Sequence, residues 1–133
     1  MKGNELNTAL LALLSTTSTF NTSIGGRVYV NQAPLGTLTP FCVITTASDA
    51  LSYDSGTEFQ DVVTQFSVFA EEKTGAVSGR IIDELESLLS TAKATLSVTS
   101  GRLMQFRKSI RREDNNSNIF HKLIQYKIKI QIT

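Results

Sequence analysis

The stretch Gln60–Leu89 constrains the fold most, because it joins a strand and a helix that each have one apolar side. From Val62 onward apolar and polar residues alternate, which is the period-2 pattern of a strand with one buried face. A short charged run ends this strand, and Thr74 is then a suitable N-cap for an amphipathic helix. Because both elements must bury their apolar sides, we expect the helix to lie across the sheet above Phe66. The apolar stripe predicted for the helix comprises Val77, Ile81, Ile82, Leu85, Leu88 and Leu89.

The rest of the chain predicts a further helix and four further strands. An apolar stripe follows Asn4 at helical spacing, and a Ser/Thr run then weakens that helix. Strands are expected at 27–30, 41–48, 103–112 and 118–133, with turns at Tyr53–Thr57 and 113–118. The tips at these two turns are polar, so we expect them to be mobile in the free protein. The order α-β-β-β-α-β-β predicts an α+β fold, with a mainly antiparallel sheet and two helices packed on one face.

The charge of the chain is unevenly distributed. Residues 1–101 contain 5 Lys/Arg and 10 Asp/Glu, whereas residues 102–133 contain 8 Lys/Arg and 2 Asp/Glu. We therefore expect an acidic body with a basic C-terminal arm. The length of 133 residues favours a single domain, 1–133, from which the C-terminal β-hairpin 102–133 protrudes. We find neither an apolar run of membrane-spanning length nor a signal-peptide layout, so we expect a soluble protein made in the cytoplasm.

The sequence offers little for catalysis, and we predict that the protein is not an enzyme. His121 and Cys42 are the only histidine and cysteine. We interpret His121 as a surface residue and Cys42 as a small apolar residue packed inside a strand. Glu84 and Glu86 lie on the polar side of the second helix and are interpreted as solubilising charge. Neither a metal site nor a cofactor site is predicted.

Two other classes of function remain open at this stage. The first is a nucleic-acid-binding module that uses the basic arm, although the aromatic residues of the arm fall on its apolar side, where they suit a core. The second is a small-ligand enzyme, which requires a deep apolar pocket with convergent polar groups.

A resemblance to a known family rests on two short motifs. Gly25–Tyr29 reads GGRVY, and after Ala33–Pro34 the chain continues with Pro40–Ile44, PFCVI. This pattern resembles the "GGRVY…AP…PYVV" signature of phage tail-completion proteins, and the order of elements over most of the chain is similar to theirs. The sequence departs from the family in its Ser/Thr-rich end to the first helix and its unusually basic final hairpin.

The resemblance implies a structural virion protein, a tail terminator at the head–tail interface. By this resemblance, such a protein forms a homo-oligomeric ring, a hexamer, on the end of the tail tube. It stops tube polymerisation and offers a face to the head connector, while genomic DNA only passes through the ring. The implied partners are thus a second copy, the major tail tube protein and the connector, without a membrane or a cofactor. A head-side neck protein is the alternative. The charge asymmetry suggests that the basic arm of one copy contacts the second helix of a neighbouring copy, and the polar tip at Tyr53–Thr57 is expected to become ordered against a partner. The candidate contact residues are Arg107, Arg111, Arg112, Lys127 and Lys129 of the arm, Asp83, Glu84 and Glu86 of the helix, and Tyr53 and Asp54 of the tip.

Overall fold

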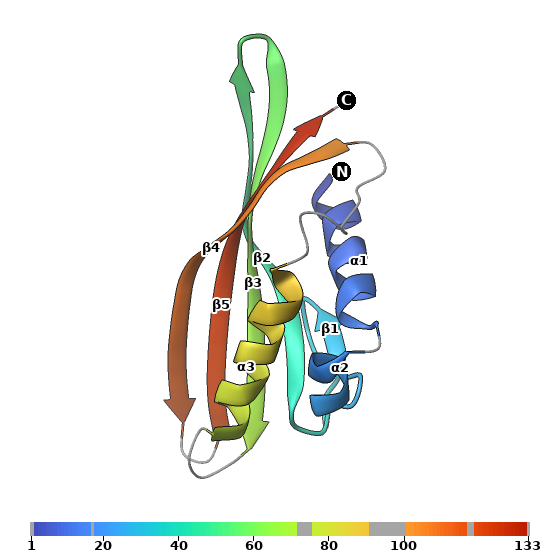
Figure 1. Ribbon diagram of the computed structural model, residues 1–133, viewed down its shortest axis with the longest axis vertical. Helices are drawn as coiled ribbons and strands as arrows, with labels where there is room; N and C mark the ends of the chain where they lie inside the picture. The colour runs from blue at the N-terminus through green and yellow to red at the C-terminus, as the bar shows by residue number, and fades with distance from the viewer. Residues whose placement is uncertain (1, 17, 72–75, 91–100, 117–118, 133) are drawn as a thin grey trace.

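The protein folds into one five-stranded sheet with helices along one face (Figure 1). The computed structural model describes residues 2–16, 18–71, 76–90, 101–116 and 119–132. The helices are α1 (Lys2–Leu14), α2 (Thr19–Ser23) and α3 (Ala76–Leu89). The strands are β1 (Val28–Val30), β2 (Phe41–Asp54), β3 (Thr57–Glu71), β4 (Gly101–Asn116) and β5 (Ile119–Ile132), in the sheet order β1-β2-β3-β5-β4. The predicted α+β class is confirmed.

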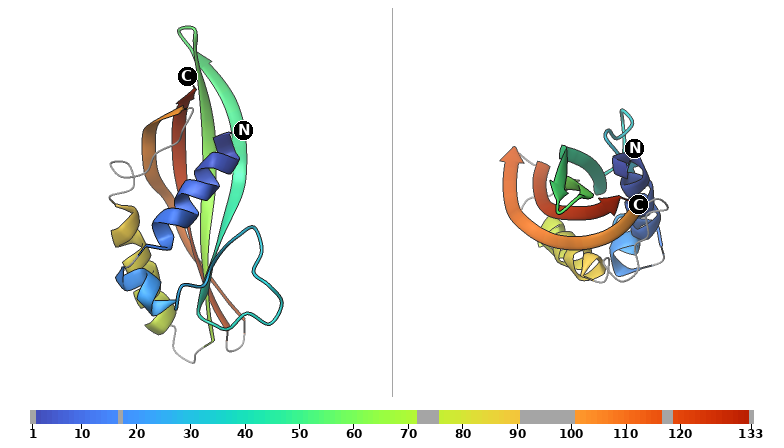
Figure 2. Two further views of the ribbon diagram at one scale, coloured as in Figure 1. Left: turned by 90° about the vertical axis from the view of Figure 1, so that its right-hand side faces the viewer. Right: turned by 90° about the horizontal axis from the view of Figure 1, so that it is seen from above.

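The core lies between the sheet and the helices, which Figure 2 shows gathered on one side of the strands. Phe66 of β3 is fully buried and meets Tyr126 of β5 edge to face, with ring centroids 5.8 Å apart. The predicted helix stripe is confirmed except at its start, because Val77 is 36% exposed and Ser78 is buried in its place. The α3 residues buried against the sheet are Ile81, Ile82, Leu85 and Leu89.

A second short helix, α2, follows α1 where the sequence predicted only a weakened helix end. Ser18 caps it, because the Ser18 side chain accepts a hydrogen bond from the Asn21 backbone N–H at 3.1 Å. Phe20 anchors it in the core with 1% of its surface exposed. The hydroxyl side chains that interrupt one helix thus begin the next, since short polar side chains compete for backbone groups and also cap them.

The sheet is mixed at one edge only. β1 pairs with β2 in parallel, with Val28 opposite Cys42, whereas the other neighbouring strands are antiparallel. Cys42 is fully buried, as predicted.

The hairpin β2–β3 is longer than predicted and extends beyond the helices (Figure 1). β2 ends at Asp54 and β3 begins at Thr57, so the turn between them contains two residues instead of the five expected. Ser55 and Gly56 both have positive φ, at 52° and 80°. This combination is typical of the tight type I′ turn, whose twist matches that of the flanking strands.

The C-terminal hairpin β4–β5 is part of the sheet and does not protrude. β5 pairs with β3 from Phe59↔Gln131 to Glu71↔Ile119, so it is a central strand with β4 outside it. We expected the hairpin 102–133 to protrude, but the β2–β3 hairpin extends beyond the helices instead. The sequence could not show this, because alternation predicts a strand and not its neighbours. The expected turn at 113–118 is shorter than predicted, because β4 continues to Asn116. Its residues 117–118 and the predicted cap at Thr74 lie outside the described residues.

Candidate functional site

The two glycines of the GGRVY motif form the turn that leads into β1. Gly25 and Gly26 have φ angles of 61° and 74°, where other residues are strained. Arg27 follows, and its guanidinium donates hydrogen bonds to the carbonyl of Pro40 at 3.0 Å and to that of Thr39 at 3.5 Å. A Cβ at Gly25 would lie 2.7 Å from the Arg27 guanidinium. The motif therefore holds both ends of the loop 31–40 together, which is a structural role.

This loop carries two of the most exposed apolar side chains in the described chain. Leu35 is completely exposed and Leu38 is 72% exposed. A turn at Pro34–Thr37 presents them, closed by a backbone hydrogen bond of 3.1 Å. Exposed leucines on a loop held at both ends are a candidate contact surface.

A second exposed apolar surface lies on the β2–β3 hairpin, which extends from the opposite end of the molecule (Figure 2). Leu51 is 57% exposed and Tyr53 is 71% exposed. Of the predicted contact residues, Tyr53 and Asp54 belong to this hairpin. The sequence alone did not identify Leu35, Leu38 and Leu51, because the exposure of a lone leucine depends on which elements cover it.

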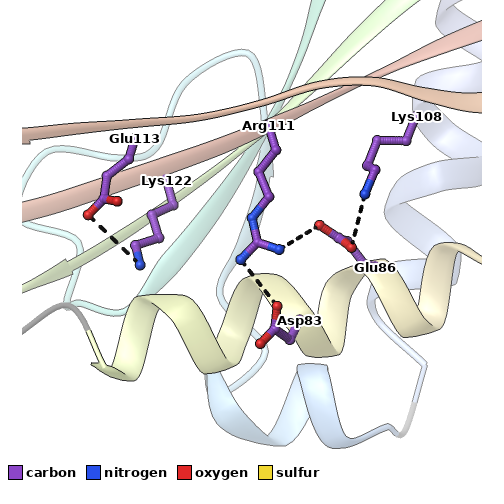
Figure 3. Close-up of polar contacts among 6 residues, drawn as sticks. All are labelled: Asp83, Glu86, Lys108, Arg111, Glu113 and Lys122. Atoms are coloured by element: carbon purple, nitrogen blue, oxygen red, sulfur yellow. Dashed lines mark hydrogen bonds and ion pairs between the residues drawn. The ribbon is translucent and has the colours of Figure 1, made fainter.

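A cluster of ion pairs connects α3 to β4 (Figure 3). Arg111 lies 3.1 Å from a carboxylate oxygen of Asp83 and 3.0 Å from one of Glu86. Lys108 lies 3.5 Å from the other oxygen of Glu86. Along the same strand, Glu113 is 3.9 Å from Lys122. Three predicted contact residues, Asp83, Glu86 and Arg111, are therefore paired with one another within the chain.

A β-bulge in β4 turns Arg111 toward α3. Lys108 pairs with Tyr126 and Ile110 pairs with Gln125, so Ser109 is an extra residue without a partner position in β5. Beyond the bulge the alternation is reversed, so Ile110 points outward and is 41% exposed. Strict alternation along the expected strand 103–112 would place Arg107 and Arg111 on the same polar face. That placement is wrong, because a bulge shifts every later side chain to the opposite face.

Glu84 also differs from its interpretation as a solubilising charge. Its carboxylate accepts a hydrogen bond from the Ser23 hydroxyl at 2.8 Å, and it lies 3.4 Å from Arg80. Only 13% of its side chain is exposed. Glu84 therefore ties α2 to α3.

The remaining predicted contact residues lie on the sheet face without helices. The register places Arg107 of β4 opposite Lys127 of β5, and both side chains point away from the core. The exposed residues of this group are Arg107, Arg112 and Lys127. Lys129 is half-buried, and its ammonium lies 4.8 Å from the ring centroid of Phe59. This face thus carries a group of cations, three of them exposed.

The same face has a row of stacked rings near its other end. Phe41 stacks on Phe69 at 5.0 Å, and Phe69 stacks on His121 at 4.2 Å. His121 is thus half-buried and not the plain surface residue that we expected. A shallow cavity of about 350 Å³ borders these rings. Within the residues described, we find neither a group of metal-ligating side chains nor a helix long and apolar enough to cross a membrane.

The fold defines a small α+β protein with a separate exposed apolar surface at each of its two ends. The sequence model of the family "Tail completion protein gp17" matches residues 8–131, so the chain belongs to this family. It is therefore a structural protein of the virion tail, assembled with other virion proteins, and not an enzyme. The resemblance of the sequence to phage tail-completion proteins is thus confirmed.

A solved structure supports the fold. The chain is similar to a chain of the virion of a native gene transfer agent (GTA) particle, with a TM-score of 0.80 and 14% identity. The match covers 98% of this chain and 97% of the other. No curated protein sequence matches the chain.

Proposed function

We propose that this protein is the tail terminator. Copies of it form a ring, a hexamer by analogy with the family, on the end of the tail tube, where the ring stops polymerisation and offers a face to the head connector. The observation that carries the proposal is the separation of two exposed apolar surfaces, Leu51–Tyr53 on the β2–β3 hairpin and Leu35–Leu38 on the loop. A protein that joins a tube to a connector needs contacts at two ends, and exposed apolar groups suit such contacts.

A tube-assembly assay tests this proposal. The tube protein is polymerised with and without this protein, and tube lengths and tube ends are examined by negative-stain electron microscopy. We expect rings on tube ends and shorter tubes. A protein that stays monomeric at high concentration and leaves tube ends bare would contradict the proposal.

Two matched variants distinguish the two ends. The first variant replaces Tyr53 with Ser, and the second replaces Leu35 and Leu38 with Ser. All three side chains are exposed, so both variants are expected to fold. We expect each variant to lose one activity, tube capping or connector binding, and to keep the other. A protein that binds the connector but never affects tube length supports the head-side neck alternative instead.

A further inference from the structure

Two long edges of the sheet are open, and the first belongs to β2. β1 covers β2 only at Cys42–Ile44. In the part of the chain that the structure describes, Thr45–Asp54 has no strand beside it on that side. The nearby helix α1 contacts this stretch through the Asn7 amide, which donates a hydrogen bond to the Thr46 hydroxyl at 3.3 Å. At about 3.3 Å per residue the open stretch is roughly 30 Å long.

The orientation of the backbone on this edge follows from one hydrogen bond. The Asn31 N–H donates to the Ile44 carbonyl at 2.8 Å, so the Ile44 backbone polar groups point away from β3. Ile44 lies opposite Phe66 of β3. After the bulge at Ala47, the β3 residues that alternate in step with Phe66 lie opposite Asp49, Leu51 and Tyr53. The backbone N–H and C=O groups of Asp49, Leu51 and Tyr53 therefore point away from β3, where another strand can form hydrogen bonds with them.

The second open edge is β4, whose far side has no strand among the described residues. The two edges carry opposite charge. Residues 41–71, which include β2 and β3, contain five Asp/Glu and no Lys or Arg, while residues 101–132 contain eight Lys/Arg and two Asp/Glu. Edge strands usually carry lysine or proline to prevent pairing with other chains. β2 contains neither, whereas the β4 edge is exposed and basic.

The strand directions suit a contact between the two edges. β2, β3, β5 and β4 alternate in direction across the sheet, so β2 and β4 are antiparallel. Copies in a ring are related by rotation about the ring axis. When the strands run along that axis, the rotation preserves the direction of each strand, so β2 of one copy meets β4 of the next in antiparallel orientation. The two edges also lie at the same height, because Ser48, Val63, Lys127 and Arg107 form one cross-strand row.

We propose that neighbouring copies in the ring join edge to edge, with the open edge of β2 in one copy pairing antiparallel with β4 of the next. This inference rests on the proposed ring function, and it specifies the contact that closes the ring. The contact is heterologous, as a ring requires. Two β4 edges repel each other, as do two β2–β3 hairpins, so the charges favour the unlike pair.

A proline variant tests the backbone contact directly. Leu51→Pro removes an N–H that points outward, and proline is tolerated on the solvent side of an edge strand. Leu51→Thr is the matched control, because it also removes the leucine side chain but keeps the N–H. We expect Leu51→Pro to weaken self-association of the protein alone, without tube or connector, at least tenfold, and Leu51→Thr to weaken it much less. Analytical ultracentrifugation and negative-stain images of the rings measure the difference.

The outcomes separate this inference from the ring proposal. If the parent forms rings and Leu51→Pro forms them equally well, edge pairing is wrong while the ring stands. If the parent forms no ring on tube ends, the ring proposal itself fails.

A cysteine pair gives an answer even if the proline variant does not fold. Ser48→Cys with Arg107→Cys introduces two thiols in one cross-strand row, three strand spacings or about 14 Å apart within a copy. That distance is too long for a disulfide within one chain. Oxidised rings should therefore give a ladder of covalent oligomers on a non-reducing gel, and either single variant should stop at dimers or below. Rings of the double variant that yield only monomers after oxidation overturn the proposal.

Discussion

The two hairpins of the sheet, β2–β3 and β4–β5, have strands of similar length but differ in charge and local geometry. The β2–β3 hairpin has a two-residue turn, one bulge and no basic residue. The β4–β5 hairpin is basic, and its outer strand has two bulges. One of these bulges turns Arg111 to α3, while Arg107 remains on the open face.

This difference shows that charge in a sequence does not specify a binding surface. Of the cations in β4, Lys108 and Arg111 stabilise the chain's own helix through Glu86 and Asp83. The acidic hairpin, by contrast, has no basic residue within it to pair with, and it extends beyond the helices (Figure 1). We therefore expect the complementary surfaces of neighbouring copies to be the acidic β2–β3 hairpin and the basic β4–β5 hairpin, and not the β4–β5 hairpin and α3.

The largest expected effect concerns the core that both hairpins share. Phe66 in β3 is fully buried, whereas Phe106 in β4 is partly buried, and both contact Tyr126. Phe66→Ala should lower the free energy of unfolding by about 3–5 kcal/mol, because it leaves a cavity in a closed site. Phe106→Ala should cost less than half as much in urea unfolding. Equal losses would show that β4 is as deeply packed as β3.

The next effect is a loss of stability at alkaline pH, with one titrating group in each hairpin. Burial raises the pKa of the Cys42 thiol to about 12. Burial, with a smaller effect of the Glu86 carboxylate, raises the pKa of the Tyr126 hydroxyl to about 12. The folded state thus holds both protons more tightly than the unfolded state. The stabilisation is complete below the ordinary pKa of each group and is lost as the pH rises toward about 12.

Two variants measure how much of this loss of stability at alkaline pH comes from Cys42 and how much from Tyr126. Cys42→Val should remove more of it than Tyr126→Phe, because Cys42 is completely buried and Tyr126 is not. Thermal unfolding between pH 8 and 11 measures the slope for each variant. A larger reduction for Tyr126→Phe would place the more strongly desolvated group in β5.

The bulge in β4 predicts a difference between two arginines that lie four residues apart. Arg111→Glu places a carboxylate beside Asp83 and Glu86 and should cost about 1 kcal/mol, since the pairs are partly exposed. Arg107→Glu should leave the free energy of unfolding nearly unchanged. Raising the salt concentration should reduce the Arg111 effect. If both variants lose the same stability, the bulge does not separate the two side chains.

The smallest effect lies at the tip of the β2–β3 hairpin. Ser55 has a φ of 52° in a tight turn, where asparagine is preferred. Ser55→Asn should raise stability by up to about 0.5 kcal/mol, a typical limit for an exposed site. Slower hydrogen exchange in the flanking strands is the measurement. It also tests the prediction, still open, that the tip is mobile in the free protein. Faster exchange in the variant would argue against the type I′ turn.

Alternation along the chain predicted which residues of β3 and β5 face the core, because a strand buried on one face shows this in its sequence. It failed at Ser109, since a bulge depends on how the partner strand lies and not on local pattern. Similarly, the glycines of the GGRVY motif were visible as a signature. Only the folded structure shows their role, which is to form the turn that lets Arg27 bind the Thr39 and Pro40 carbonyls.

The sequence by itself determined the α+β class, the core positions of β3, α3 and β5, and the family, because periodicity and motif spacing are properties of the chain. Only the tertiary structure decided which hairpin extends beyond the helices and which edges of the sheet stay open. It also decided which charges are already paired within the chain, such as Arg111 with Asp83 and Glu86. Strand neighbours and ion pairs are contacts between residues distant in sequence, so no local pattern encodes them.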